Sequence, residues 1–280
     1  MTLKGVLLLA LCWISLAAHA TPVELKLSGK LLAKAEYREG APSKPAVLFL
    51  HGFLQTHEFP TIHRLIGGVA DSGHTVLAPT LSLGITHRRQ SLACEAIHTH
   101  TMKDALREID AWVKWLKARH NGPIILVGHS SGSVEALAYL SGKPDPAIGG
   151  FIGISIVEGR IKMNAVETAR LIKEMRLAVK TGTPRVTTQQ FSFCQKYQAT
   201  PASLLSYLEW TPQRVLDAAA TLAPPNLFIM GGRDDRLGEG WVGELKKRNR
   251  VIIIEGANHF MDGEHEFDLL DVILNELNTR

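Results

Sequence analysis

The chain alternates short apolar runs with longer segments of helical periodicity from residue 45 onward. This alternation is typical of a parallel β-sheet flanked by helices, and it predicts an α/β fold. The runs are rich in Val, Ile and Leu, which suits strands buried on both faces. A mixed stretch at 23–37 fits an antiparallel hairpin at the sheet edge. The expected buried strands are 46–50, 75–78, 124–127, 150–156, 226–230 and 250–254.

Two segments outside these strands have an apolar face at helical spacing. The first covers 105–116 and ends before Gly122-Pro123, and it can cover a face of the sheet. The second covers 264–277 and closes the domain. We place Phe267 on the apolar side of this last helix.

The stretch 158–222 interrupts the alternation, because one helical pattern near 166–175 is followed by no buried apolar run. Thr200-Pro201 and Thr211-Pro212 each place a hydroxyl where it can cap a helix and a proline at the first helical position. We therefore predict a helical cap at 158–222, inserted into a core formed by 21–157 and 223–280.

The composition is that of a folded globular protein, with 45% hydrophobic and 21% charged residues over 280 positions. The formal net charge is +4. Lys and Arg are interspersed with Asp and Glu and form no long run, which indicates a solvated surface and no nucleic-acid partner.

The motif Gly128-His129-Ser130-Ser131-Gly132 lies between a predicted strand and a segment of helix-forming composition. A strand that turns this sharply into a helix needs glycines on both sides of the central serine, whose hydroxyl is then held exposed. The helix N-terminus also favours negative charge that develops near it. Ser130 is therefore a candidate nucleophile, and we expect His129 to pack or hydrogen-bond locally.

A serine hydroxyl is a poor nucleophile at neutral pH and needs a base that is itself oriented by a carboxylate. Strand 226–230 runs into the GGRDD segment at 231–235, and strand 250–254 runs into the EGANH segment at 255–259. Catalytic groups gather at the carboxyl ends of parallel strands. A carboxylate and His259 are therefore expected near Ser130, in the chain order Ser, Asp, His.

The strand at 46–50 leads into the turn His51-Gly52-Phe53. Backbone N–H groups in such a turn can face a reacting carbonyl. Together with the N–H of Ser131, the N–H of Phe53 would stabilise a tetrahedral oxyanion, an interaction worth about 3 kcal/mol per donor.

Four segments together, at 51–53, 128–132, 231–234 and 256–259, resemble the α/β-hydrolase superfamily in their order and context. The resemblance covers residues 46–259 except the cap. It implies an eight-stranded, mostly parallel sheet flanked by helices. It also implies hydrolysis through an acyl-enzyme with a Ser130, Asp234 and His259 triad, but no particular substrate.

The position of the triad acid has two readings. The family carries a single Asp at G-x-x-D after this strand, whereas Asp234 and Asp235 are adjacent here. Counting from Gly231 selects Asp234, and counting from Gly232 selects Asp235. We favour Asp234 and expect the other carboxylate to be solvated or paired with a neighbouring arginine.

Other polar residues are not assigned to chemistry. Glu95, His98 and His100 lack the three- or four-residue spacing of metal ligands on a helix, so we predict capping or surface contacts and no metal site. Arg88 and Arg89 could bind an anionic substrate, but a charge pair in a loop is usually solvated, and we expect that here. No cofactor is expected.

The first twenty residues have the pattern of a secretory signal peptide, with Lys4 before an apolar run at 5–16 and cleavage after Ala20. The run is shorter than the ~20 residues that a transmembrane anchor needs. The residue immediately after the cleavage point is not a cysteine, as a lipoprotein signal would require. We therefore expect an exported protein, periplasmic or secreted, without a stable membrane anchor.

Cys12 would leave with the signal peptide, so that Cys94 and Cys194 remain. An oxidising compartment permits a disulfide between them, joining the loop after strand 75–78 to the cap. Two buried free thiols are the alternative.

The leading hypothesis for function is hydrolysis of a carboxylic ester or a related acyl compound of small size. Thioesters, amides and short peptides are left open, as is the oligomeric state. A binding protein that keeps the fold without turnover is the second hypothesis, and it is disfavoured because all three candidate triad residues are present. Dehalogenase-like chemistry would need a carboxylate where this chain has Ser130.

Overall fold

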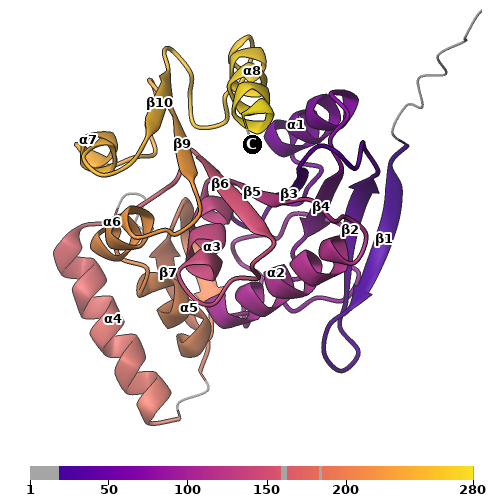
Figure 1. The fold of residues 1–280 in the computed structure, drawn as a ribbon. Helices are drawn as coiled ribbons and strands as arrows, with labels where there is room; N and C mark the ends of the chain where they lie inside the picture. The colour runs from indigo at the N-terminus through magenta and orange to yellow at the C-terminus, as the bar shows by residue number, and fades with distance from the viewer. Residues whose placement is uncertain (1–18, 159–162, 183–184, 280) are drawn as a thin grey trace, which may run out of the picture.

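The structure is a computed structural model that describes residues 19–158, 163–182 and 185–279. Its strands form one eight-stranded sheet and a separate pair (Figure 1). The strands are β1 (Thr21–Lys26), β2 (Leu32–Arg38), β3 (Ala46–Leu50), β4 (Val76–Thr80), β5 (Ile124–His129), β6 (Ile148–Ile154), β7 (Thr187–Phe191), β8 (Cys194–Ala199), β9 (Asn226–Gly231) and β10 (Val251–Ile254). The helices are α1 (Pro60–Asp71), α2 (Met102–Lys117), α3 (Ser131–Leu140), α4 (Ala165–Lys180), α5 (Pro201–Leu208), α6 (Pro212–Ala220), α7 (Trp241–Lys246) and α8 (His265–Asn278).

The main sheet is mostly parallel, with the strand order β1-β2-β4-β3-β5-β6-β9-β10. β2 pairs antiparallel with both β1 and β4. All other neighbouring strands in this sheet are parallel. The predicted α/β fold with an eight-stranded, mostly parallel sheet is confirmed. The hairpin expected at 23–37 is present as β1 and β2.

Helices cover both faces of this sheet (Figure 1). α1 and α8 pack together on one face, where they share an apolar cluster with alternate residues of β3, β5 and β9. α2, α3, α6 and α7 contribute to the cluster on the other face. Because successive side chains of a strand point to opposite faces, each central strand supplies both cores, which explains its continuous apolar run.

The prediction that Phe267 lies on the apolar side of α8 is wrong, since its side chain is 65% exposed. The inward face of α8 is formed by Leu269, Ile273 and Leu277, which recur every four residues. Phe267 lies two residues before Leu269, about 200° away around the helix axis, and therefore faces solvent.

The segment between β6 and β9 contains α4, β7, β8, α5 and α6. Three helices lie in the described part of the segment predicted as a helical cap, and it also contains a feature that was not predicted, since β7 and β8 form an antiparallel hairpin. Its strands are rich in Thr, Gln and Lys, and only some of their side chains are buried, so no apolar run marks them in the sequence. Residues 159–162 and 183–184 of this segment lie outside the described residues. The cap boundaries at 158 and 222 stay a prediction.

The two helix starts predicted in this segment are confirmed. The hydroxyl of Thr200 accepts a hydrogen bond from the backbone N–H of Ser203 at the start of α5. The hydroxyl of Thr211 does the same for Arg214 at the start of α6. A proline follows each threonine at the first helical position.

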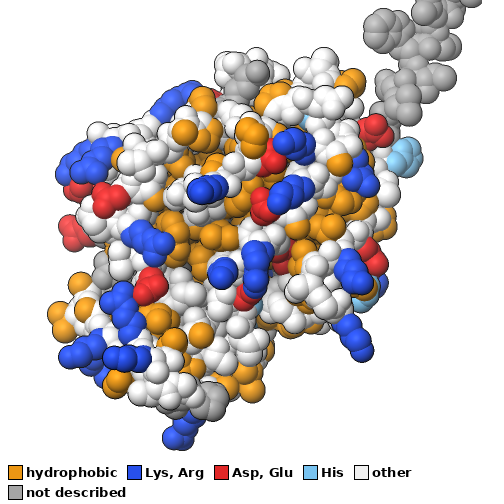
Figure 2. All heavy atoms as spheres, turned by 60° about the horizontal axis from the view of Figure 1, so that its bottom comes forward, with side chains coloured by type: hydrophobic (Ala, Val, Ile, Leu, Met, Phe, Trp, Pro, Cys, Tyr) orange, Lys and Arg blue, Asp and Glu red, His pale blue; other side chains and the backbone are white. Residues whose placement is uncertain are grey.

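The surface carries both signs of charge. On the face shown in Figure 2, Lys and Arg side chains are scattered among acidic and hydrophobic ones and do not gather into one stripe. Within the described part of the chain, no helix has both the length and the apolar character needed to cross a membrane. The predicted signal peptide at 1–20 lies outside the described residues except for its last two positions.

Candidate active site

The turn between β5 and α3 holds Ser130 in a conformation that residues with a side chain rarely adopt. Its φ is 57° and its ψ is −120°. The backbone N–H of Ser130 donates to the carbonyl oxygen of Ile154 on β6, at 2.8 Å. The hydroxyl of Ser133 donates to the carbonyl oxygens of Gly128 and Ile154, at 2.7 and 3.1 Å. The neighbouring strand therefore holds the strained turn in place.

Gly128 and Gly132 are required by close backbone packing around this turn. A Cβ atom on Gly128 would lie 2.6 Å from backbone atoms of Gly132. A Cβ atom on Gly132 would overlap the carbonyl oxygen of His51. A larger residue at 128 would force the turn itself open, and one at 132 would push it away from the end of β3 and the loop that follows.

Ser130, His259 and Asp234 form one hydrogen-bonded row. His259 Nε2 lies 2.9 Å from Ser130 Oγ, and His259 Nδ1 lies 2.7 Å from Asp234 Oδ2. Because an ionised carboxylate only accepts, the Nδ1 atom carries the imidazole proton and Nε2 is left to accept from the serine hydroxyl. The side chains of His259 and Asp234 are 3% and 0% exposed. The row has the geometry of a nucleophile beside an oriented base.

Asp235 takes no part in this row. It is exposed, and it forms no hydrogen bond or ion pair with another described residue. Asp234, by contrast, accepts a second hydrogen bond at Oδ1 from the backbone N–H of Arg236, at 3.0 Å. Of the two candidate acids, the structure brings only Asp234 to His259.

The loops after β9 and β10 approach each other closely and so bring Asp234 to His259. The backbone N–H of Arg233 donates to the carbonyl oxygen of Ala257, at 2.8 Å. A Cβ atom on Gly231 would lie 2.5 Å from the same oxygen. Gly231 is therefore needed for the close approach of the two loops.

The backbone N–H groups of Phe53 and Ser131 have no hydrogen-bond partner among the described residues. Ser131 begins α3, where N–H groups lack an intrahelical acceptor. Phe53 lies in the loop after β3. Both residues line one cavity of about 40 Å³. Two free N–H groups next to a nucleophile can act as an oxyanion hole.

Arg88 is buried, so the prediction of a solvated arginine pair is wrong for this residue, whereas Arg89 is exposed. The guanidinium of Arg88 donates to the carbonyl oxygens of Leu81 and Gln55, both at 2.7 Å, and lies 3.0 Å from His51 Nε2. Burial lowers the pKa of Arg88 to about 10. A planar group with five donors can connect several carbonyls at once, and here it fixes the loop that carries Phe53.

His51, the first residue after β3, also helps to fix the loop that carries Phe53. Its Nε2 accepts from the backbone N–H of Leu81 at 3.0 Å, so Nδ1 carries the proton and donates to the carbonyl oxygen of Gly52 at 2.9 Å. Burial, reinforced by the positive charge of Arg88, lowers the pKa of His51 to about 3. His51 is therefore neutral and orients the backbone that leads into Phe53.

His129 connects the elbow to the loop of the candidate base. Its Nε2 lies 3.0 Å from the backbone carbonyl oxygen of His259, to which it donates. The expected local contact is replaced by a partner 130 positions away in the sequence. Burial, reinforced by His259, lowers the pKa of His129 to about 3, so the imidazole stays neutral. Its donated hydrogen bond helps to set the position of His259 relative to Ser130.

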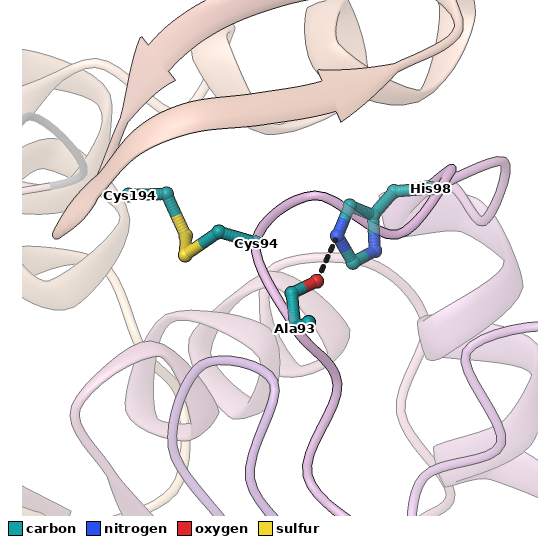
Figure 3. Close-up of a disulfide and its surroundings, with 4 residues drawn as sticks. All are labelled: Ala93, Cys94, His98 and Cys194. Atoms are coloured by element: carbon teal, nitrogen blue, oxygen red, sulfur yellow. Dashed lines mark hydrogen bonds between the residues drawn. A yellow bond between two sulfur atoms is a disulfide. The ribbon is translucent and has the colours of Figure 1, made fainter.

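A disulfide joins Cys94 to Cys194, with 5.5 Å between their Cα atoms (Figure 3). This confirms the predicted bridge. Cys94 lies in the loop between β4 and α2, and Cys194 begins β8. Close to the bridge, His98 Nε2 lies 3.2 Å from the carbonyl oxygen of Ala93 (Figure 3). The loop and the inserted segment are therefore held together covalently, and the backbone N–H of His98 adds a hydrogen bond to Gln198 at 2.8 Å.

His98 and His100 are 1% and 5% exposed, so the prediction of surface contacts is wrong for both. His98 stacks on the ring of Tyr197 with 4.3 Å between centroids, and His100 packs edge-on against Tyr207 at 5.6 Å. Glu95 is exposed. Within the described ranges, no group of three His, Cys, Asp or Glu side chains is arranged to hold a metal ion.

Three solved structures illustrate the similarity of fold. Est1E from Butyrivibrio proteoclasticus with bound ferulic acid has a TM-score of 0.67 and 16% identity, over 92% of this chain and 100% of that one. A monoacylglycerol lipase of Paleococcus ferrophilus has a TM-score of 0.63 and 16% identity, over 92% and 98%. A thioesterase domain from the curacin biosynthetic pathway has a TM-score of 0.59 and 17% identity, over 91% and 99%. At these identities the similarity shows the fold alone.

A comparison of the sequence with curated proteins gave no match. A comparison with models of protein families did give a match. The pattern described as "Alpha/beta hydrolase family" matches residues 47–271, which include the elbow, both loops at the sheet edge and the turn after β3. The chain therefore belongs to the alpha/beta hydrolase family.

Proposed function

We propose that this protein is a serine hydrolase that cleaves a carboxylic ester or a related acyl compound through an acyl-enzyme. The observation that carries the proposal is the distance of 2.9 Å between Ser130 Oγ and His259 Nε2, in an imidazole whose other nitrogen is held by Asp234. The base is thus within hydrogen-bond reach of both the nucleophile and the orienting carboxylate.

The first half-reaction forms the acyl-enzyme. Ser130 Oγ attacks the carbonyl carbon of the substrate while His259 Nε2 takes the hydroxyl proton. The carbonyl oxygen becomes negative and accepts hydrogen bonds from the N–H groups of Phe53 and Ser131. His259 then gives its proton to the leaving oxygen, the carbon–oxygen bond breaks, and the alcohol departs.

The second half-reaction releases the acid. His259 takes a proton from a water molecule, whose oxygen attacks the carbonyl carbon bound to Ser130. The proton then returns to Ser130 Oγ as the ester bond to the enzyme breaks. Throughout both steps, Asp234 keeps the imidazole in the tautomer with a free Nε2 and stabilises its protonated form.

The names of the structural neighbours support an acyl substrate, since they include a monoacylglycerol lipase and a thioesterase domain. The test is turnover of purified protein on 4-nitrophenyl esters of graded chain length, with matched thioesters and anilides. We expect the oxygen esters or thioesters to be hydrolysed and the Ser130→Ala variant to be inactive on all of them. Wild-type protein without turnover on any acyl compound would favour the alternative of a binding protein.

We also propose that the protein is exported. The Cys94–Cys194 disulfide supports this, because disulfides persist in oxidising compartments. The expected signal peptide ends at Ala20, so a mature chain should begin at Thr21. Mass measurement of the protein from periplasmic, secreted and cytosolic fractions tests this. A full-length chain confined to the cytosol would contradict it.

A further inference from the structure

Arg236 lies two residues after the proposed triad acid, and its guanidinium is held against two aromatic rings. The guanidinium carbon is 4.6 Å from the ring centroid of Phe260 and 5.9 Å from that of Phe193. The backbone N–H of Arg236 donates to Asp234 Oδ1 at 3.0 Å, which fixes the start of the side chain. Guanidinium groups pack favourably over aromatic faces and keep their charge there. The contacts therefore fix the position of the charge without neutralising it.

The same contacts place Arg236 between the proposed oxyanion hole and the proposed base. On the oxyanion side, the ring of Phe193 packs edge-on against Phe53, with 5.6 Å between centroids. On the side of the base, the ring of Phe260 packs edge-on against His259, at 5.2 Å. The guanidinium is thus no farther from the His259 ring than its distance to Phe260 and the distance from Phe260 to His259 taken together. It lies close to the reaction centre.

The guanidinium of Arg236 has no hydrogen-bond or ion-pair partner among the described residues. The residue is half-buried, and its guanidinium nitrogens remain open to solvent. The carboxylate of Asp234 is already engaged, with one oxygen on His259 and the other on the backbone of Arg236. Asp235, the neighbour in sequence, is exposed and forms no ion pair with Arg236. The charge of Arg236 is therefore available to a ligand.

The charge of Arg236 also acts on the buried imidazoles of the site. Burial is the main cause of the lowered pKa of His129, and the positive charge of Arg236 is among the further causes. The rings of His129 and His259 are 5.3 Å apart. His259 becomes positively charged in both half-reactions, so an uncompensated guanidinium nearby works against them. A negative group of the substrate that pairs with Arg236 offsets this repulsion.

A carboxylate suits this position better than a phosphate. The guanidinium presents parallel N–H donors that match the two oxygens of one carboxylate. A phosphate monoester brings a charge of about −2 at neutral pH, which a single guanidinium among aromatic rings leaves partly uncompensated. The rings of Phe53, Phe193 and Phe260 favour an apolar or aromatic spacer between the carboxylate and the reacting carbonyl.

We propose that Arg236 binds a carboxylate on the leaving group of the substrate. The inference rests on the proposed hydrolase function and adds the substrate class, which is an ester or thioester whose alcohol or thiol carries a negative charge. The leaving-group side is assigned because Arg236 packs on Phe260, the residue next to His259. His259 must give its proton to the leaving atom, so the leaving group departs on the side of this imidazole.

The experiment uses three esters that share an aryl leaving group and differ in its charge. Their leaving groups are 4-hydroxyphenylacetate, its amide and (4-hydroxybenzyl)trimethylammonium, with side-group charges of about −1, 0 and +1 at pH 7. The acyl group is the one that the wild-type protein hydrolyses fastest among the 4-nitrophenyl esters. Each kcat/KM is divided by the rate of reaction with hydroxide. At low ionic strength, we expect the anionic ester to exceed the amide by about fivefold or more and the cationic ester to be the poorest.

The dependence on salt tests the contact in the wild-type protein alone. Added NaCl screens an ion pair that is open to solvent, so the ratio of the anionic to the neutral ester should fall by at least about twofold between about 0.02 and 1 M NaCl. A ratio that stays constant over this range would overturn the charge contact.

Variants test the assignment to Arg236. Arg236→Gln removes the charge and should bring the ratio to within about twofold of one. Arg236→Lys keeps the charge but loses the paired donors, and it should retain part of the preference. Arg233→Gln is the matched control, because Arg233 is exposed in the same loop, and it should keep the wild-type ratio. Thermal melting verifies that each variant is folded, and the Lys variant and the salt dependence decide the matter if Arg236→Gln is not.

A preference for the anionic ester that is lost in Arg236→Gln and kept in Arg233→Gln establishes the subsite. Three results would overturn it while leaving the hydrolase proposal intact. These are an active wild-type protein that does not prefer the anionic ester, a preference that survives in folded Arg236→Gln, and an equal loss of preference in Arg233→Gln. Failure of every ester, together with no labelling of Ser130 by a fluorophosphonate, overturns the proposed function and this inference with it.

Discussion

Asp234 Oδ2 lies 2.7 Å from His259 Nδ1, whereas the adjacent Asp235 is exposed and makes no contact with that imidazole. Only a carboxylate bonded to Nδ1 can hold His259 in the tautomer that leaves Nε2 free for Ser130. Two neighbouring residues of the same type thus have different surroundings, which provides a matched pair for mutation.

Asp234→Asn should lower kcat by about three to four orders of magnitude, because an amide at this position favours the wrong tautomer of His259. Asp235→Asn should change kcat by no more than about twofold, since a solvated surface charge contributes little. Steady-state kinetics on one ester measures both variants. The reverse ranking would move the triad acid to Asp235.

Arg88→Lys should lower kcat by about ten- to a hundredfold with a smaller change in KM, because Lys keeps the charge but loses the planar donors that fix the loop of Phe53. The role is one of positioning, so the effect should fall on the transition state. Arg89→Lys is the control, since Arg89 is exposed. Equal kinetics for the two variants would show that the buried guanidinium does not orient the oxyanion hole.

Replacing both Cys94 and Cys194 with serine should lower the free energy of unfolding by about 4 to 5 kcal/mol, the value of the chain-entropy model for a loop of this length. The two residues are 100 positions apart. Urea unfolding of the double variant should match that of reduced wild-type protein. Two free thiols in denatured, unreduced protein from the exported fraction would contradict the bridge.

The free energy of unfolding should fall as the pH drops below about 6.5. Burial lowers the pKa values of His51, His100 and His129 to about 3, whereas in the unfolded chain they stay near 6.5. Between these two pKa values the unfolded state binds protons that the folded state does not. Each of these histidines therefore lowers the free energy of unfolding by up to about 1.4 kcal/mol for every pH unit by which the pH falls.

Urea unfolding at pH 7, 6 and 5 measures this slope. His100→Gln removes one of the three groups and should flatten it, while replacement of the exposed His63 by Gln should not. If the free energy of unfolding is instead constant between pH 7 and pH 5, the buried imidazoles accept protons while the protein stays folded, which would contradict the prediction.

The sheet and the catalytic loops could be predicted from the sequence because their signals are local. Continuous apolar runs mark strands buried on both faces, and the glycines at 128 and 132 mark a turn with no room for a Cβ atom. The order of the motifs along a parallel sheet then places Ser130 and His259 at one edge.

The supporting contacts could not be predicted, because they depend on tertiary burial of polar residues. Nothing in the sequence around Arg88 distinguishes it from the exposed Arg89, yet only Arg88 binds the loop of Phe53. Similarly, the partner of His129 is a backbone carbonyl far along the chain. The β7–β8 hairpin was missed for a related reason, since its polar strands bury only part of their side chains.

The most direct test of the account is labelling with a fluorophosphonate, followed by intact-mass measurement and peptide mapping. The account predicts one adduct per chain, located on Ser130, with no adduct in Ser130→Ala and much slower labelling in Asp234→Asn. Thermal melting shows whether the unlabelled variants are folded. An adduct on another residue, or a folded wild-type protein that is not labelled, would contradict the claim that Ser130 is an activated nucleophile.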